Sequence, residues 1–259
     1  MRTSEVAEQV YWLPLGAGLR AANAYFIGSA GSWCLVDAGW PRDAPAIRQA
    51  ADELFGASAR PAAVLLTHDH PDHAGAAREL ALAWGCQVWM HPLEVLLASA
   101  DAEAIRRYAG PLDRWVILPL LRLMGRRRMQ AILAKGSLAE VAAPLDADAP
   151  VPGLPEWEVF PTPGHTPGHV AYVRRDDRVV LTGDALVSVD LNSLRGIVSQ
   201  ERRLAEPPWY TTWSWPAAKA SAAAVAGLAP RVVAAGHGAP LTGPDAGTML
   251  RAFLCASRR

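Results

Sequence analysis

Residues 64–73 of this 259-residue chain read VLLTHDHPDH. The apolar run Val64–Thr67 has the composition of a buried strand, and the six residues after it contain three histidines and two aspartates. A loop at the end of a strand can direct alternate side chains toward one point, and imidazoles with carboxylates are ligands that divalent first-row metals favour. The stretch therefore predicts a metal site. Its candidate ligands are the histidines His68, His70 and His73 and the aspartates Asp69 and Asp72.

The remaining histidines extend the predicted site. They are His91, His165, His169 and His237, and the last three lie in Gly/Pro-rich loops directly after predicted strands. Loops at strand ends are where α/β proteins assemble their sites. The segment Thr182-Gly183-Asp184 adds a carboxylate at another strand end. Seven ligands of these types would hold two metals, and the loop of residues 163–169 supplies one or two of them, His165 and His169.

The hydrophobic pattern around this stretch alternates between strand and helix periods, which predicts the α/β class. Short apolar runs with glycine-rich turns between them predict an opening β-meander. The expected elements are strands at Val10–Leu15, Ala24–Ile27 and Trp33–Val36, a helix over Asp43–Leu54, the strand Val64–Thr67, a helix over Ala74–Trp84 and a strand at Cys86–Met90.

The alternation breaks over residues 93–143, where apolar and basic helical sequence predicts an insertion into a single domain of residues 1–259. We expect the insertion to shape the substrate pocket, although its apolar residues could instead pack as plain helices. Its Arg126–Arg128 run is more typical of a solvated face than of an anion clamp. The apolar residues are Leu96, Leu97, Ile105, Tyr108, Trp115, Leu118, Leu121, Leu123 and Met124.

Beyond the insertion, strands are expected at Glu156–Phe160, Val170–Arg174, Val179–Thr182 and Arg231–Ala235. A helix is expected after Ser214, which is a good N-cap, as far as Gly227. Three aromatic positions between Asp184 and His237 could line the site or pack in the core: Trp209, Trp213 and Trp215.

Composition limits the partners. The 25 basic and 25 acidic residues cancel, so no global field favours nucleic acid. Three widely spaced cysteines predict no disulfide framework and suit a reducing cytoplasm.

The N-terminus lacks the pattern of a signal peptide. The longest apolar run, Trp115–Leu121, is far shorter than the roughly 20 residues that span a bilayer, so we expect no stable membrane insertion and a small-molecule substrate.

These motifs resemble those of the metallo-β-lactamase superfamily of metallohydrolases, in order and in local context. The resemblance begins at Asn23-Ala24-Tyr25 and Asp37-Ala38-Gly39 and covers nearly the whole chain apart from the insertion. It implies a four-layer αβ/βα sandwich of two mixed β-sheets with outer helices. It also implies two ligand groups that share Asp184 as a bridge, namely His68, His70 and His165 for one metal and Asp72, His73 and His237 for the other.

The resemblance further implies a hydrolase in which a metal-bridging hydroxide attacks an ester, thioester or lactone of a small molecule. Asp72 would orient the nucleophile or return a proton to the leaving group. The two divalent ions are expected to be Zn, with Mn or Fe as alternatives. Asp184 stands where true β-lactamases usually have Cys or Ser, so the motifs are closer to glyoxalase II-like and lactonase-like members. Only 22 residues follow His237, which argues against a glutathione-recognising helical domain.

Two other functions remain open. Persulfide dioxygenases share the same motifs but hold one iron with three ligands, which here would be His70, His165 and Asp184. A non-catalytic metal-binding protein of the same fold is the third reading. Four neighbouring residues are expected in supporting or structural roles: Asp37, Asp69, His91 and His169.

Overall fold

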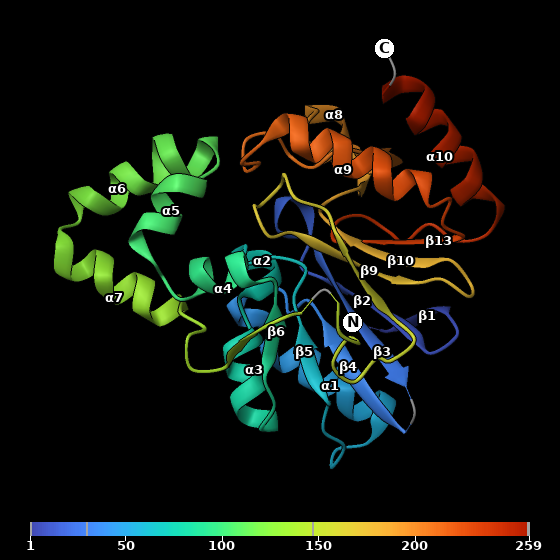
Figure 1. Cartoon of the computed structure of the whole chain (residues 1–259), viewed down its shortest axis with the longest axis horizontal. Helices are drawn as coiled ribbons and strands as arrows, with labels where there is room; N and C mark the ends of the chain where they lie inside the picture. Colours follow the sequence, from blue (N-terminus) through green and yellow to red (C-terminus); the bar gives the residue numbers. More distant parts are fainter. Residues whose placement is uncertain (1, 30, 147, 258–259) are drawn as a thin grey trace.

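Two β-sheets packed face to face form the centre of the protein in a computed structural model, which describes residues 2–29, 31–146 and 148–257 (Figure 1). The first sheet has the strand order β1-β2-β3-β4-β5-β6-β7, antiparallel from β1 to β4 and parallel from β4 to β7. Its strands are β1 (Ser4–Ala7), β2 (Val10–Leu15), β3 (Ala22–Ser29), β4 (Ser32–Val36), β5 (Ala63–Leu65), β6 (Val88–Met90) and β7 (Ala142–Pro144).

The second sheet has the order β13-β10-β9-β8, in which only β10 and β13 are parallel. A separate antiparallel pair, β11 with β12, lies beside it. The strands are β8 (Glu158–Pro161), β9 (Val170–Arg174), β10 (Val179–Gly183), β11 (Val187–Val189), β12 (Arg202–Ala205) and β13 (Val232–Ala235). Both main sheets are therefore mixed, as the resemblance implies.

Three apolar clusters show that the molecule has four layers. Helices α1 (Ala44–Phe55) and α3 (Ala77–Trp84) pack on the outer face of the first sheet, and α9 (Trp215–Gly227) and α10 (Pro244–Ser257) pack on the outer face of the second. A third cluster fills the space between the sheets. Strand β3 illustrates the period-two pattern, since Phe26 faces α1 and Tyr25 faces the second sheet.

The fold is thus the αβ/βα sandwich of the metallo-β-lactamase class. Several boundaries differ from the sequence-based prediction. The helix expected at Ala74–Trp84 is split into α2 (Pro71–Ala74) and α3, and the break falls where Gly75 packs against Pro41. The sequence pattern missed β1, β11, β12, α10 and the short helix α8 (Leu194–Ser199). Two short 3-10 turns complete the N-terminal half, at Gly18–Arg20 and Pro41–Asp43.

The insertion is helical but ends as a strand. It forms α4 (Pro92–Ala98), α5 (Ala102–Tyr108), the π-helical turn η3 (Asp113–Ile117), α6 (Leu118–Leu123) and α7 (Arg126–Gly136). Residues 142–143, expected within the helical part, belong to β7 and pair with β6. Helices α6 and α7 project away from both sheets (Figure 1). No helix among the described residues is long and apolar enough to cross a membrane.

Candidate metal centre

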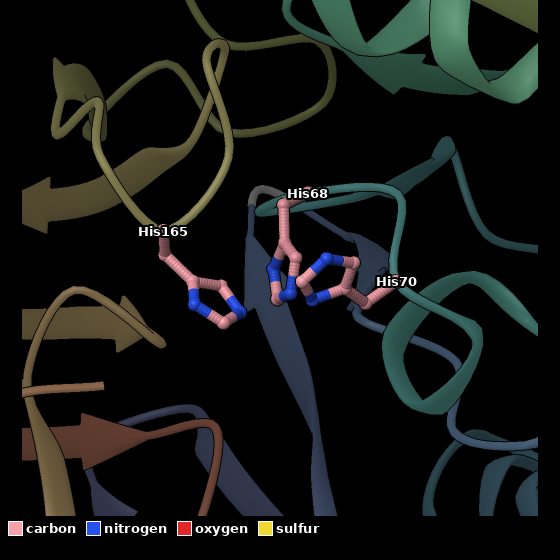
Figure 2. Close-up of side chains that lie close together, drawn as sticks. All are labelled: His68, His70 and His165. Atoms are coloured by element: carbon pink, nitrogen blue, oxygen red, sulfur yellow. The ribbon is translucent and has the colours of Figure 1, made fainter. Parts of the chain in front are cut away.

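The VLLTHDHPDH stretch places four ligand-type side chains at one rim of the sandwich. Strand β5 ends at Leu65, and the loop after it passes through His68 and His70 into the short helix α2. His68 and His73 are completely buried, whereas Asp72 retains 22% of its side-chain exposure. Figure 2 shows His68, His70 and His165 turned toward a common point, although His165 comes from a loop almost a hundred residues later.

Besides His165, two more side chains reach the same place from the second sheet. Asp184 follows β10 and His237 follows β13, and these two strands are parallel neighbours, so both residues leave the same sheet edge. The glycines before them are required by close packing. A Cβ on Gly236 would meet the carboxylate of Asp184, and Gly183 has φ +48° with Thr67 and His169 against it.

The ligand atoms form three overlapping groups, one of which contains Asp184. Within each group these atoms lie within 4.8 Å of one another. The carboxylate of Asp184 lies 3.4 Å from His165 Nε2, 3.5 Å from His73 Nε2 and 3.2 Å from His237 Nε2. The groups are His68, His70 and His165; His68, His73 and Asp184; and Asp72, His73 and His237.

The outward ring nitrogen of each of four histidines is held by an acceptor. His73 Nδ1 lies 2.8 Å from an Asp37 oxygen, and His237 Nδ1 lies 2.7 Å from the carbonyl oxygen of Ala21. Carboxylates and carbonyls only accept, so both imidazoles donate from Nδ1. His68 and His165 contact the hydroxyls of Thr67 (3.0 Å) and Thr212 (3.1 Å), which already donate to Asp37 and to a carbonyl oxygen.

In His68 and His165, whose lowered pKa favours the neutral ring, these contacts leave the Nε2 lone pair pointing into the cluster. His68 Nε2, His165 Nε2 and Asp184 Oδ1 are buried and have no hydrogen-bond partner among the described residues. Buried polar atoms without partners are rare in folded proteins. Histidines that bind metals are held in this way from behind, so the residues present fit divalent metal ions.

Asp37 holds the histidine loop in place. Its carboxylate accepts hydrogen bonds from Thr67 N (2.8 Å), Thr67 Oγ1 (2.8 Å) and His73 Nδ1 (2.8 Å). Its backbone has φ +58°, a conformation that costs energy for a residue with a side chain. The position agrees with the expected supporting role, since this aspartate touches both ends of the loop.

The electrostatics of the cluster are strongly coupled. Although burial lowers it, the pKa of His73 is raised to about 9 by Asp184, Asp37 and Asp72. Burial would raise the pKa of Asp184, but the charges of His237 and His73 hold it well below its usual range. Burial lowers the pKa of His68 and His165, and the neighbouring imidazoles add to the effect.

Two other histidines of the sequence lie outside the ligand groups. His169 has both ring nitrogens engaged, because Nε2 accepts from Asp184 N (3.0 Å) and Nδ1 contacts Thr162 Oγ1 (2.7 Å). His91 caps α4 by accepting from Leu93 N at 3.1 Å. Both arrangements match the supporting roles expected for these residues.

A buried carboxylate that the sequence analysis did not single out links the two histidine loops. Glu94, on α4, is completely buried, and its oxygens accept from Asp69 N (2.9 Å) and Gly168 N (2.8 Å). Asp69 therefore lies beside Glu94; burial and then the charge of Glu94 raise the pKa of Asp69. The only signal in the sequence was a single acid among apolar residues at the start of a helix.

The three tryptophans between Asp184 and His237 in the sequence lie beside the metal-ligand cluster. Trp209, Trp213 and Trp215 line a pocket of about 940 Å³ whose described lining residues include none of the seven ligand-type side chains. Thr212, which contacts His165, also lines this pocket, so the two sites share a wall. Tyr210 is half-buried, and burial raises its pKa. The charge of His237 acts to lower this pKa, and the charges of Asp184 and Asp72 act to raise it.

With the fold and the metal-ligand cluster described, the comparisons define the class of protein. The profile of the metallo-beta-lactamase superfamily matches residues 17–237, and the chain belongs to this superfamily of metallohydrolases, whose members bind divalent metals. The "Probable metallo-hydrolase YflN" of Bacillus subtilis is 33% identical over 234 residues, which are 89% of this chain and 85% of that protein.

Solved structures agree. The metallo-beta-lactamase family protein TTHA1429 of Thermus thermophilus superposes with a TM-score of 0.68 at 23% identity, covering 98% of this chain and 81% of that one. TTHA1623, solved in a di-iron-bound form, gives a TM-score of 0.54 at 26% identity and covers 89% of this chain and 94% of that one.

Proposed function

We propose that the protein is a dinuclear metal-dependent hydrolase. His68, His70 and His165 would hold one divalent ion, Asp72, His73 and His237 the second, and Asp184 would bridge the two. The observation that supports this most directly is that His68 Nε2, His165 Nε2 and Asp184 Oδ1 are buried without a hydrogen-bond partner among the described residues, within a cluster of three overlapping ligand groups. A single ion would leave one of the two groups unused.

The chemistry follows from this ligand set. When bound, two such ions lower the pKa of a water that they share and polarise the carbonyl that it attacks. The Asp72 side chain is 22% exposed, and its Oδ2 lies 3.4 Å from His237 Nε2. We assign to Asp72 the orientation of the nucleophile and the return of a proton to the leaving group. Asp37, Thr212 and the carbonyl of Ala21 keep the histidines in the tautomer that binds metal.

The proposed substrate is a small molecule with an ester, thioester or lactone group. The insertion reaches toward the cluster, because the charge of Asp113 at the start of η3 acts on His70. We propose that the insertion shapes the substrate pocket. Zinc is the proposed metal, with manganese or iron as alternatives, and TTHA1623 is a relative of known di-iron content. The three free cysteines support a reducing location such as the cytoplasm.

Metal content per chain is the first test. Elemental analysis of protein purified without added metal is expected to give two ions per chain, falling to about one in His237→Ala. His91→Ala is the matched control, because this histidine caps a helix and should leave the content at two. A single iron that is unchanged in His237→Ala would refute the dinuclear site and favour oxygen chemistry on a persulfide.

Hydrolysis is tested separately on a panel of esters, thioesters and lactones. Turnover of at least one class is expected, and Asp184→Asn should abolish it while the circular dichroism spectrum is unchanged. No turnover by the fully loaded protein with zinc, manganese or iron would contradict the hydrolase assignment and leave a binding protein of the same fold.

A further inference from the structure

The helical insertion exposes an apolar stripe that nothing in the rest of the described chain covers. Leu112, Val116, Leu120 and Leu123 recur at intervals of four, four and three residues, so they lie along one side of the continuous helical segment of η3 and α6. Leu120 is 54% exposed and Leu123 84%. Trp115, in the same segment, is 76% exposed, which is unusual for the largest apolar side chain.

Basic residues surround this stripe. Between residues 104 and 136 the sequence contains one acidic residue, Asp113, in a chain whose total charge is zero. None of the described basic side chains in this range forms an ion pair with another described residue. The basic residues are Arg106, Arg107, Arg114, Arg122, Arg126, Arg127, Arg128 and Lys135.

The insertion is anchored at its base and projects at its tip. Leu112 N donates to the carbonyl oxygen of Tyr210 at 2.7 Å, Gly110 packs against the backbone of Thr211, and Tyr108 packs edge-on against Trp213. The far end, α6 with α7, is the part of the molecule farthest from both sheets on that side (Figure 1). The stripe is thus presented outward by a fixed base.

The charge distribution selects one kind of partner. A second copy that docked through this same surface would oppose two strongly positive patches, which is unfavourable. A lipid surface with anionic headgroups is complementary, because an amphipathic helix buries its apolar face among the acyl chains and its arginines contact the phosphates. Tryptophan favours this interface because its ring is apolar and its N–H is polar.

We propose that the insertion docks the protein on an anionic lipid surface, with Trp115, Leu120 and Leu123 entering the interface and the flanking arginines contacting headgroup phosphates. The protein then lies on the membrane without spanning it. The proposal does not depend on the reaction at the metal centre.

Vesicle sedimentation tests the proposal with the full-length protein. Binding is expected to vesicles made of equal parts of phosphatidylcholine and phosphatidylglycerol, little binding to phosphatidylcholine alone, and release by high salt. Arg122→Gln, Arg127→Gln and Arg128→Gln together should lower the partition coefficient on the order of a hundredfold. The double variant Trp115→Ser and Leu123→Ser should lower it by about tenfold or more.

Matched controls remove the same kinds of group elsewhere. Arg48→Gln, Arg231→Gln and Arg251→Gln together remove three exposed charges from the sandwich, and Leu82→Ser removes an apolar side chain that is 48% exposed on α3. Both controls should bind vesicles as the parent does. Circular dichroism and metal content establish that every variant is folded.

Three results would overturn the proposal. One is the absence of binding to the anionic vesicles. Another is an equal loss of binding in the control variants, which would mean a non-specific charge effect. The third is vesicle-independent self-association, seen by sedimentation velocity and removed by the Trp115→Ser and Leu123→Ser double variant, which would make the stripe a contact between copies.

Discussion

Replacing Glu94 with glutamine should weaken metal binding although no ligand is removed. The Glu94 carboxylate accepts from Asp69 N, between His68 and His70, and from Gly168 N, next to the loop of His165. It therefore holds together the two loops that supply the three-histidine group. Glutamine has nearly the same shape, but only one of its two terminal atoms can accept a hydrogen bond.

The magnitude follows from these two bonds. A hydrogen bond to a charged group contributes about 1.5–3 kcal/mol, and a buried donor left without a partner costs about 1–3 kcal/mol. One of the two hydrogen bonds is lost, and the other is made to a neutral acceptor. The free energy that holds the two loops together therefore falls by a few kcal/mol. Partners that hold metal ligands from behind typically contribute 10- to 100-fold to affinity. We expect a loss of that size at the three-histidine group and little change at the group of Asp72, His73 and His237.

Competition against a chromophoric chelator measures the two affinities on the metal-free protein. Thermal unfolding of the metal-free protein, followed by circular dichroism, measures the stability of the fold in parallel. Glu79→Gln is the matched control, because this glutamate is exposed on α3 and contacts neither loop. It should leave both affinities and the unfolding temperature unchanged.

Three outcomes would refute the reasoning. If Glu94→Gln binds both ions as the parent does, the loops are positioned without the carboxylate. If only the unfolding temperature falls while both affinities persist, Glu94 stabilises the fold and does not position the ligands. Equal weakening of both sites would mean that the loops and Asp184 move as one unit, which is also contrary to the selective loss expected.

Three further predictions test the site. Thr212→Val removes the partner of His165 Nδ1 and should weaken metal binding at the three-histidine group about tenfold in chelator competition. Thr211→Val should leave this affinity unchanged. Asp184→Asn should lower metal content, measured by elemental analysis, because an amide is a poor bridge. In the metal-free protein the raised pKa of His73, about 9, adds stability below pH 6.5 that is lost as the pH rises through 9, so urea unfolding should show a decline over that interval; an increase would contradict it.

Local sequence predicted the strands around the metal centre, although not all of their bounds. Strands with apolar runs, such as β9, match their predicted bounds, because a strand buried on both faces has little choice of residue. The prediction placed β5 at Val64–Thr67, but the strand ends at Leu65. Thr67 leaves the strand because its backbone N–H binds the carboxylate of Asp37 instead of a neighbouring strand.

Long-range contacts were beyond the reach of the sequence pattern. Asn23 belongs to a recognised motif, yet its function is visible only in space, where its amide donates to the carbonyls of Ala235 and Gly238 and so fixes the backbone on both sides of His237. Thr212 and Glu94 lie 47 and 74 residues from their partners His165 and Gly168. The sequence does not indicate these partners, because threonine hydroxyls and glutamate carboxylates are usually exposed to solvent.

The insertion shows most clearly where a sequence pattern is ambiguous. The periodicity of residues 112–123 is that of an amphipathic helix, and such a stripe normally faces a core. Such a stripe suits a substrate cleft or helix packing, and helix packing does not describe Trp115 or Leu123, which are 76% and 84% exposed. Periodicity fixes which residues share a face but not what that face meets. The charge around the stripe supplies the missing information, because a helix that packs on a protein core does not need basic residues with no acidic partners on its flanks.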